Sequence, residues 1–394
     1  MKRTGSSGKN LADSAPERLD ARMGDTKASG GQASRKINRR QSGQPTISDV
    51  ARLANCSPMT VSRVINNEAS VREQTRAAVL EAIEQINYKP NRAARSLAGA
   101  AQMRIALLYS NPSASYLSEL LMGTLDQASR SDVHLVVERC EFDKDEEKVV
   151  RRLIDSGIDG FLLPSPLCDE ATLLDMLSEQ GSRAVLIGTG RAHPDHSAVM
   201  IDEYQAAYDM TSHIIGLGHR RIGFIIGNPH QTASGQRLSG YLDAMAAAGL
   251  EVDDGLVMQG LFTYRSGYDA AVRLLDQPDP PSAIFASNDD MAAAVVAVAH
   301  RRHLDVPVDL SVCGFDDTAI ASTIWPELTT IRQPIADMAR RAVDLLGNEL
   351  RGGRTGKSFK PTHVTLDYML VRRGSDAAPG LARRAFRKGG RTDG

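Results

Sequence analysis

The sequence of 394 residues predicts an α/β protein: an all-α helix-turn-helix headpiece with one further short helix, followed by two doubly wound parallel α/β lobes. Short helical patterns fill the chain from Thr46 to about Gly99. Beyond Met103, seven short apolar runs alternate with amphipathic stretches, which is the pattern of βαβ units. This second region, of roughly 270 residues, exceeds the size of a typical single domain, so we expect two lobes.

The first 44 residues are polar and basic, with ten lysines and arginines against four acidic residues. The whole chain has a net charge of -1, but the first hundred residues carry +8 and the remainder carries -9. Residues 1–44 contain hardly any bulky apolar side chains, so a disordered basic tail is expected. Its arginines either contact phosphates or are simply solvated, and the basic end of the chain is the end expected to meet nucleic acid.

Capping residues mark the helices of the headpiece, which is expected to span residues 45–89. Thr46 and Asp49 have the spacing of a capping box before the first helix. Ser57 is expected to cap the second helix after a tight turn, with Pro58 at its first position. A third helix is expected from about Arg72 to Ile86. The residues predicted to be buried recur at helical spacing: Ile47, Val50, Ala51, Ala54, Val61, Val64, Ile65, Val79, Leu80, Ile83 and Ile86.

The lobes are expected to fill residues 103–373. Their division is expected near residues 189–197, before a helix from Tyr204 to Leu217, and from Gly374 the apolar pattern ends, so a flexible basic tail is expected over 374–394. The predicted strands are the apolar runs Ile105–Tyr109, Val133–Val137, Gly160–Leu163, Val185–Ile187, Ile222–Ile226, Ala283–Ala286 and Leu310–Gly314.

One face of the second helix carries Met59, Ser62, Arg63 and Asn66 at helical spacing, opposite its apolar residues. A polar helix face is often only solvated. Here it follows a tight turn in a basic segment, and Arg and Asn form bidentate bonds to base edges when such a helix enters the major groove. This face is therefore a candidate for reading DNA.

Two runs identify a family resemblance: TISDVARLANCSPMTVSRVIN from Thr46 to Asn66 and TRAAVLEAIEQINYKPNRAARSLAG from Thr75 to Gly99. They resemble the signature of the LacI/GalR repressors. The resemblance implies that Pro58 and Met59 select bases, whereas Arg72 departs from the small capping residue common in the family. The DNA-binding residues that it implies are Thr46, Pro58, Met59, Thr60, Ser62, Arg63, Asn66, Tyr88, Asn91, Arg92, Arg95 and Leu97.

Residues 90–102 form a short, weakly amphipathic stretch. It is either a plain linker helix or, through the resemblance, a hinge helix that folds on operator DNA, with Leu97 as the wedge in the minor groove. A helix this short is marginal alone, so its folding would depend on how the lobes hold its partner helix in a dimer.

In the lobes the resemblance implies a periplasmic-binding-protein type I fold that binds an effector, expected to be a sugar or sugar derivative, in the cleft. Arg237 is expected to clamp hydroxyls or a carboxylate, and Phe262 either stacks on the ligand or belongs to the core. Gly188 stands where several sugar-binding relatives carry an acidic residue. The implied effector-binding residues are Ser115, Tyr116, Arg237, Phe262, Asn288, Asp316 and Gln333.

Other functions are disfavoured by what the sequence lacks. Its four cysteines are far apart, without metal-ligand spacing, so neither a zinc site nor a disulfide framework is expected. The paired acids Asp289–Asp290 and Asp316–Asp317 lack a nucleophile or metal constellation, so no enzyme activity, metal or cofactor is expected. His219, beside two arginines, suggests a phosphate site, but a structural role is preferred. The polar N-terminus and the absence of a long apolar run favour a cytoplasmic protein without membrane contact over a transport solute-binding protein.

The expected function is that of a transcriptional regulator. A homodimer would bind double-stranded, pseudo-palindromic operator DNA, and effector binding would change the angle between the lobes and so the hinge helices. Release of DNA on effector binding is the favoured hypothesis, and corepression stays open, because the sequence does not show which lobe angle the ligand prefers.

Overall fold

The computed structural model describes residues 46–65, 71–86, 102–141, 144–354 and 359–379. The chain divides into two compact units, residues 1–92 and 93–394, and each is described by itself. Among the described residues, no helix combines the length and apolar character that crossing a bilayer requires. The expected tail over residues 1–44 lies outside the described part of the chain.

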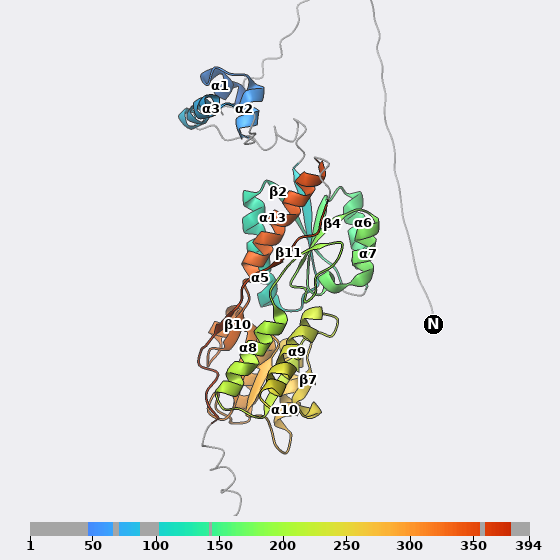
Figure 1. Ribbon diagram of the computed structural model, residues 1–394, viewed down its shortest axis with the longest axis vertical. Coiled ribbons are helices and arrows are strands. Elements are labelled where there is room, and N and C mark those ends of the chain that lie inside the picture. The colour runs from blue at the N-terminus through green and yellow to red at the C-terminus, as the bar shows by residue number, and fades with distance from the viewer. Residues whose placement is uncertain (1–45, 66–70, 87–101, 142–143, 355–358, 380–394) are drawn as a thin grey trace, which may run out of the picture. The chain divides into compact units, whose positions relative to one another are not determined.

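The headpiece consists of α1 (Ile47–Leu53), α2 (Pro58–Ile65) and α3 (Glu73–Gln85) (Figure 1). These bounds confirm the three helices that the sequence predicts. Leu80 was expected to be buried but is 50% exposed, because the face of α3 that packs on α1 and α2 carries the preceding residue, Val79. The buried core of this unit comprises Val50, Ala51, Val61, Val64, Val79 and Ala82.

The caps of the headpiece follow the sequence. The carboxylate of Asp49 accepts hydrogen bonds from the backbone N–H and the hydroxyl of Thr46 at 3.0 and 2.7 Å. The Ser57 hydroxyl oxygen accepts one from the backbone N–H of Thr60 at 3.1 Å. Arg72 precedes α3 without a side-chain cap bond, which agrees with its departure from the family pattern. Short polar side chains satisfy N–H groups that have no partner within a helix.

The first lobe contains a parallel six-stranded sheet with the strand order β11-β5-β4-β3-β1-β2. Its strands are β1 (Met103–Tyr109), β2 (Val133–Arg139), β3 (Gly160–Pro164), β4 (Arg183–Ile187), β5 (Ser197–Met200) and β11 (His363–Thr365). The helical elements of this lobe are α5 (Ala114–Arg130), α6 (Glu146–Asp155), η1 (Leu167–Asp169), α7 (Ala171–Glu179) and α13 (Ile335–Arg354).

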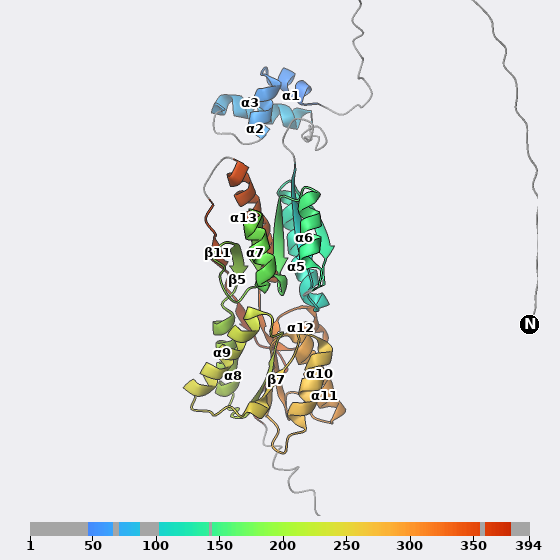
Figure 2. The ribbon, with the colours of Figure 1, turned by 90° about the vertical axis from the view of Figure 1, so that its right-hand side faces the viewer.

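The second lobe repeats this plan with the order β12-β10-β9-β8-β6-β7, in which only β12 runs antiparallel to its neighbour. Its strands are β6 (Ile222–Ile226), β7 (Val257–Gln259), β8 (Ala283–Ala286), β9 (Ser311–Asp316), β10 (Thr329–Arg332) and β12 (Met369–Val371). Its helical elements are α8 (Glu203–Gly216), α9 (Thr232–Ala247), η2 (Asp254–Leu256), α10 (Tyr264–Leu275), α11 (Asp289–Arg301) and α12 (Ala319–Thr323). Figure 2 shows α8 and α9 on one side of this sheet and α10 and α11 on the other.

The division between the lobes differs from the expected one. Strand β5 pairs with β4, so the first passage into the second lobe follows Met200 rather than residues 189–197. After β10 the chain returns to the first lobe through α13, which packs on α5, and after β11 it enters the second lobe again as β12 (Figure 1). Each lobe is therefore built from two chain segments. Apolar patterning reveals seven of the twelve strands of the described residues, and it does not show which sheet a strand joins.

The tail expected over residues 374–394 was predicted to begin too early, because the residues after Gly374 still belong to the folded second lobe. Ser375 is fully buried, and its hydroxyl oxygen accepts a hydrogen bond from the backbone N–H of Thr329 at 2.9 Å. The carboxylate of Asp376 lies 2.7 Å from the ring nitrogen Nε2 of His213. This segment is polar, but its polar groups are satisfied inside the second lobe, so the folded structure continues through the described residues to 379.

Candidate functional site

The candidate DNA-reading face lies on α2. Pro58, Met59 and Arg63 are exposed, and the Met59 side chain is 64% accessible. Ser62 and Thr60 are half-buried, and the Thr60 hydroxyl lies 2.9 Å from the hydroxyl of the capping Ser57. An exposed methionine and arginine one turn apart, opposite the core residues of α2, suit contact with base edges.

Of the other predicted DNA contacts, Thr46 is exposed at the N-terminal cap of α1. The rest lie outside the described residues, as does the whole of the expected hinge except residue 102: Asn66, Tyr88, Asn91, Arg92, Arg95 and Leu97.

A pocket lies between the two lobes; about 30 Å³ of it is free for the centre of a water molecule, within about 380 Å³ of empty space that includes open solvent. Most of its residues follow the carboxyl ends of parallel strands, where open α/β sheets bind ligands. Six of the seven predicted effector residues line it, and the seventh, Ser115, does not. The lining residues are Asn111, Ser113, Tyr116, Ser165, Gly188, Glu203, Gln231, Ala233, Arg237, Phe262, Asn288, Asp316 and Gln333.

Arg237 is already paired within the pocket. Its Nε donates to the Glu203 carboxylate at 2.7 Å, and both side chains are at least 95% buried. Its guanidinium also donates to the carbonyl of Ser287 and stacks on Phe315, 3.7 Å from the ring centroid. Burial raises the pKa of Glu203, and the charge of Arg237 opposes that rise. Because the two charges offset each other, Arg237 offers a ligand its remaining N–H donors but little net positive charge.

Asp316 and Gln333 form a buried pair beside this arginine. The Gln333 side-chain amide donates to the Asp316 carboxylate at 2.6 Å. Burial raises the pKa of Asp316 well above its ordinary value, and this outweighs the opposing effect of Arg237. The buried amide oxygen of Gln333 and the buried amide nitrogen of Gln231 have no hydrogen-bond partner. An unpaired buried polar atom costs about 1–3 kcal/mol, so a ligand with both donors and acceptors would relieve this cost.

Phe262 and Asn288 each have a structural role as well. The Phe262 ring lines the pocket and also belongs to the apolar cluster of the second lobe, so both interpretations of this residue apply. The Asn288 side chain caps α11 by accepting from the backbone N–H of Met291 at 3.0 Å, and its amide donates to the Phe262 carbonyl at 3.2 Å. Its amide oxygen retains one lone pair that can accept from a ligand.

On the first-lobe side, the two residues that were expected in a loop, Ser115 and Tyr116, lie in the first turn of α5. Ser113 caps α5 and lines the pocket, whereas Ser115 already lies in the first turn of the helix, and Tyr116 is buried against the pocket. Gly188 has φ +72°, and a Cβ atom added there would lie 3.0 Å from the Tyr116 hydroxyl. The departure at Gly188 thus has a physical reason, since a larger residue would be strained and would crowd that hydroxyl.

Direct hydrogen bonds join the lobes at two places beside the pocket. The carboxylate of Asp169 in the first lobe accepts from the hydroxyl and backbone N–H of Thr232 in the second lobe at 2.7 and 3.0 Å. The Ser113 hydroxyl donates to the Asp290 carboxylate at 2.5 Å. Most of the pocket's side chains are buried, and these bonds link the two lobes beside them.

Sequence reasoning did not identify the lining residues Asn111, Ser113, Ser165 and Ala233, nor two that set the polar chemistry of the pocket, Glu203 and Gln231. Both stand at the start of helices of the second lobe, where acidic and polar residues are common for capping alone. Nothing in their local pattern signals burial. His219, by contrast, has the structural role that was preferred: it is buried, and its ring nitrogens lie 2.8 Å from the Ser282 hydroxyl and the Ala377 carbonyl.

The fold and the pocket together define a class of protein: a helix-turn-helix unit that suits DNA, on one chain with a two-lobed unit that suits a small molecule. Comparisons with known proteins agree with this class. The family described as "Bacterial regulatory proteins, lacI family" matches residues 46–91, and the "Periplasmic binding protein-like domain" matches residues 211–375.

The relatives and solved structures that the chain resembles are transcription regulators. The ribose operon repressor of Escherichia coli strain K12 is 34% identical, over 84% of this chain and 99% of the relative. A complex of the transcriptional regulator CelR with cellobiose is 33% identical with a TM-score of 0.64, over 84% of this chain and all of the other. The lac repressor dimer bound to operator and the anti-inducer ONPF is 25% identical with a TM-score of 0.64, over 85% of this chain and all of the other. The chain belongs to the LacI family of DNA-binding transcriptional regulators.

Proposed function

We propose that this regulator binds a sugar or sugar derivative between its lobes, and that this effector changes the affinity of a homodimer for a pseudo-palindromic operator. The observation that carries the proposal is the buried, polar lining of the pocket, in which Gln231 and Gln333 keep an unpaired donor and an unpaired acceptor. Hydroxyl groups satisfy both kinds of atom, since each donates and accepts. The similarity to the CelR–cellobiose complex supports a sugar.

The charge of the pocket favours an uncharged effector. Arg237 is neutralised by Glu203, and burial favours the uncharged form of Asp316. A sugar phosphate or sugar acid would bring a negative charge to a site with no spare positive charge, which is costly in a buried environment. Neutral sugars should therefore bind better than their acidic or phosphorylated derivatives.

The dimer and the operator are supported by the similarity to the lac repressor dimer bound to operator. In the favoured mechanism the effector changes the angle between the lobes and thereby weakens DNA binding. Corepression uses the same pocket with the opposite preference, and the sign is decided by which lobe arrangement the effector favours. A role as a transport solute-binding protein or an enzyme is disfavoured by the family match over residues 46–91 and by relatives that are regulators. A DNA target supports a location in the cytoplasm.

The test is thermal unfolding of the full-length chain with a panel of neutral mono- and disaccharides and the corresponding sugar acids and phosphates. We expect at least one neutral sugar to raise the melting temperature, because a ligand stabilises the form that it binds. Gln231→Leu should abolish that rise without lowering the melting temperature of the free protein, since it removes an unpaired buried atom.

Gln236→Leu, on α9 but outside the pocket lining, is the matched control and should keep the response. A panel in which only acidic or phosphorylated compounds stabilise the protein would contradict the neutral effector. A shift that survives Gln231→Leu would place the ligand elsewhere.

A further inference from the structure

The turn that follows β9 has an unusual backbone. Asp316 has φ +111° and Asp317 has φ +58°, so two successive non-glycine residues adopt left-handed conformations. Such conformations cost about 1–3 kcal/mol each and persist only where the surroundings hold them. Asp316 is the residue that this turn presents to the pocket.

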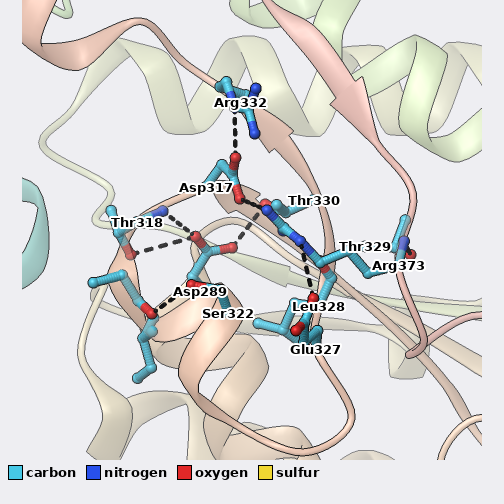
Figure 3. Close-up of polar contacts among 12 residues, drawn as sticks. Asp289, Asp317, Thr318, Ser322, Glu327, Leu328, Thr329, Thr330, Arg332 and Arg373 are labelled. Carbon is cyan, nitrogen blue, oxygen red and sulfur yellow. Dashed lines mark hydrogen bonds and ion pairs between the residues drawn. The ribbon is translucent and has the colours of Figure 1, made fainter.

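Two arginines hold the second of these aspartates. The Asp317 carboxylate accepts hydrogen bonds from the Nε of Arg332 and the Nη2 of Arg373, each at 2.6 Å (Figure 3). The Asp317 side chain is only 5% exposed. Arg373 is itself fixed, because its Nη1 donates to the Leu328 carbonyl at 2.8 Å. Bonds to two guanidinium groups fix the direction in which a buried carboxylate points.

A third contact holds the end of the turn. The carboxylate of Asp289, at the start of α11, accepts from the backbone N–H of Thr318 at 2.9 Å and from the Thr330 hydroxyl at 2.7 Å (Figure 3). Asp289 is fully buried, and a Cβ atom at Gly314 would lie 2.3 Å from its carboxylate oxygen. The close approach of α11 to β9 therefore depends on a glycine at this position.

The neighbouring strand binds the two aspartates with two successive residues. Arg332, the last residue of β10, pairs with Asp317, and Gln333, the next residue, binds Asp316 in the pocket. Successive side chains of an extended chain point to opposite sides. The same backbone segments thus fix Asp316 toward the pocket and Asp317 away from it.

We propose that Arg373 is a positioning residue of the effector site. Together with Arg332 and Asp289, it holds the left-handed Asp316–Asp317 turn so that the Asp316 carboxyl group and its partner Gln333 face the ligand. The inference rests on the proposed function at one point, which is that Asp316 contacts an effector. Arg373 lies in the segment after β12, so this segment takes part in binding the effector.

The experiment compares Arg373→Gln with Arg372→Gln in the full-length chain by hydrogen–deuterium exchange and mass spectrometry. Arg372 is the matched control, because it makes the same change of charge one residue away and its side chain is 62% exposed. We expect the peptide with residues 316–318 to exchange about tenfold faster in Arg373→Gln, the loss expected from a charged hydrogen bond. Peptides from β6 in the same lobe should exchange at the wild-type rate.

Two further variants separate positioning from general stability. Arg373→Lys keeps one charged donor and should recover part of the protection, and Asp317→Asn keeps the shape of the turn residue while weakening both pairs. Faster exchange throughout the second lobe, or equal exchange in Arg373→Gln and Arg372→Gln, would overturn the proposal.

A second readout uses whichever neutral sugar stabilises the wild type, whose affinity should fall about tenfold in Arg373→Gln and stay unchanged in Arg372→Gln. Unchanged affinity for that sugar in Arg373→Gln would overturn the positioning role. If no sugar of the panel binds the wild type, the proposed effector class fails, while the exchange measurement still decides whether Arg373 holds the turn.

Discussion

Replacing Glu203 by Gln tests the buried ion pair of the pocket. The substitution removes the partner of Arg237, whose side chain is 5% exposed, and leaves its charge inside the protein. Breaking a buried pair in this way typically costs about 3–5 kcal/mol. We expect the lower end of this range, since the Ser287 carbonyl and the Phe315 ring still contact the guanidinium. A loss of about 3 kcal/mol lowers the melting temperature by roughly 6–12 °C in a domain of about 150–250 residues and by less in a longer chain such as this one.

The assay is urea unfolding of the full-length chain followed by circular dichroism, with the free energy of unfolding extrapolated to water. Glu251→Gln, at an exposed position, is the control and should change stability by less than about 0.5 kcal/mol. The double variant Glu203→Leu with Arg237→Met removes both charges and should lie within about 1 kcal/mol of the wild type. The reasoning is refuted if Glu203→Gln costs less than about 1 kcal/mol, the value typical of an exposed pair.

Three further predictions concern single positions around the pocket. Asp169→Asn weakens the bonds to Thr232 that join the lobes, so more molecules should have their lobes apart. The distribution of distances between spectroscopic labels on the two lobes measures this, and an unchanged distribution would argue against the role of Asp169. Burial raises the pKa of Asp289 to about 7 from 3.8. Its contribution to stability is therefore complete below about pH 4 and lost as the pH rises through about 7. Asp289→Asn should make the fall in stability with pH shallower, and the remaining fall comes from Asp316, whose pKa burial also raises. Gly188→Ala places a Cβ at positive φ beside the Tyr116 hydroxyl, so we expect a loss of about 1–2 kcal/mol in urea unfolding, and no loss would contradict the strain.

The headpiece could be predicted from the sequence almost completely. Its caps are local: Thr46 with Asp49, and Ser57 before Pro58, each act within one turn of the chain. The exception, Leu80, shows the limit of periodicity, because two adjacent apolar residues of a helix cannot both face a narrow core.

The lobes could be predicted less completely. Seven strands follow from apolar runs, whereas the strands that were missed have only three or four residues, and β10 contains two threonines and an arginine. The return of α13 to the first lobe depends on packing between residues far apart in the sequence. No local pattern encodes that path.

The pocket could be predicted where the family resemblance supplied positions, as for Tyr116 and Arg237. The partner of that arginine could not, because Glu203 reaches it only through the packing of α8 on α9. The Ser115 expectation failed for a related reason: the cap at Ser113 sets where α5 begins, and a difference of two residues turns a side chain away from the cleft.

The most direct test of the account is operator binding by the full-length protein, measured by fluorescence anisotropy with and without the neutral sugar that stabilises it. An operator sequence is first selected from a random pool with the protein itself. The account predicts that the sugar changes the affinity for this operator by about tenfold or more, a typical allosteric coupling, and that Gln231→Leu removes the change while binding the operator as the wild type does. Equal operator affinity with and without a bound sugar would contradict it.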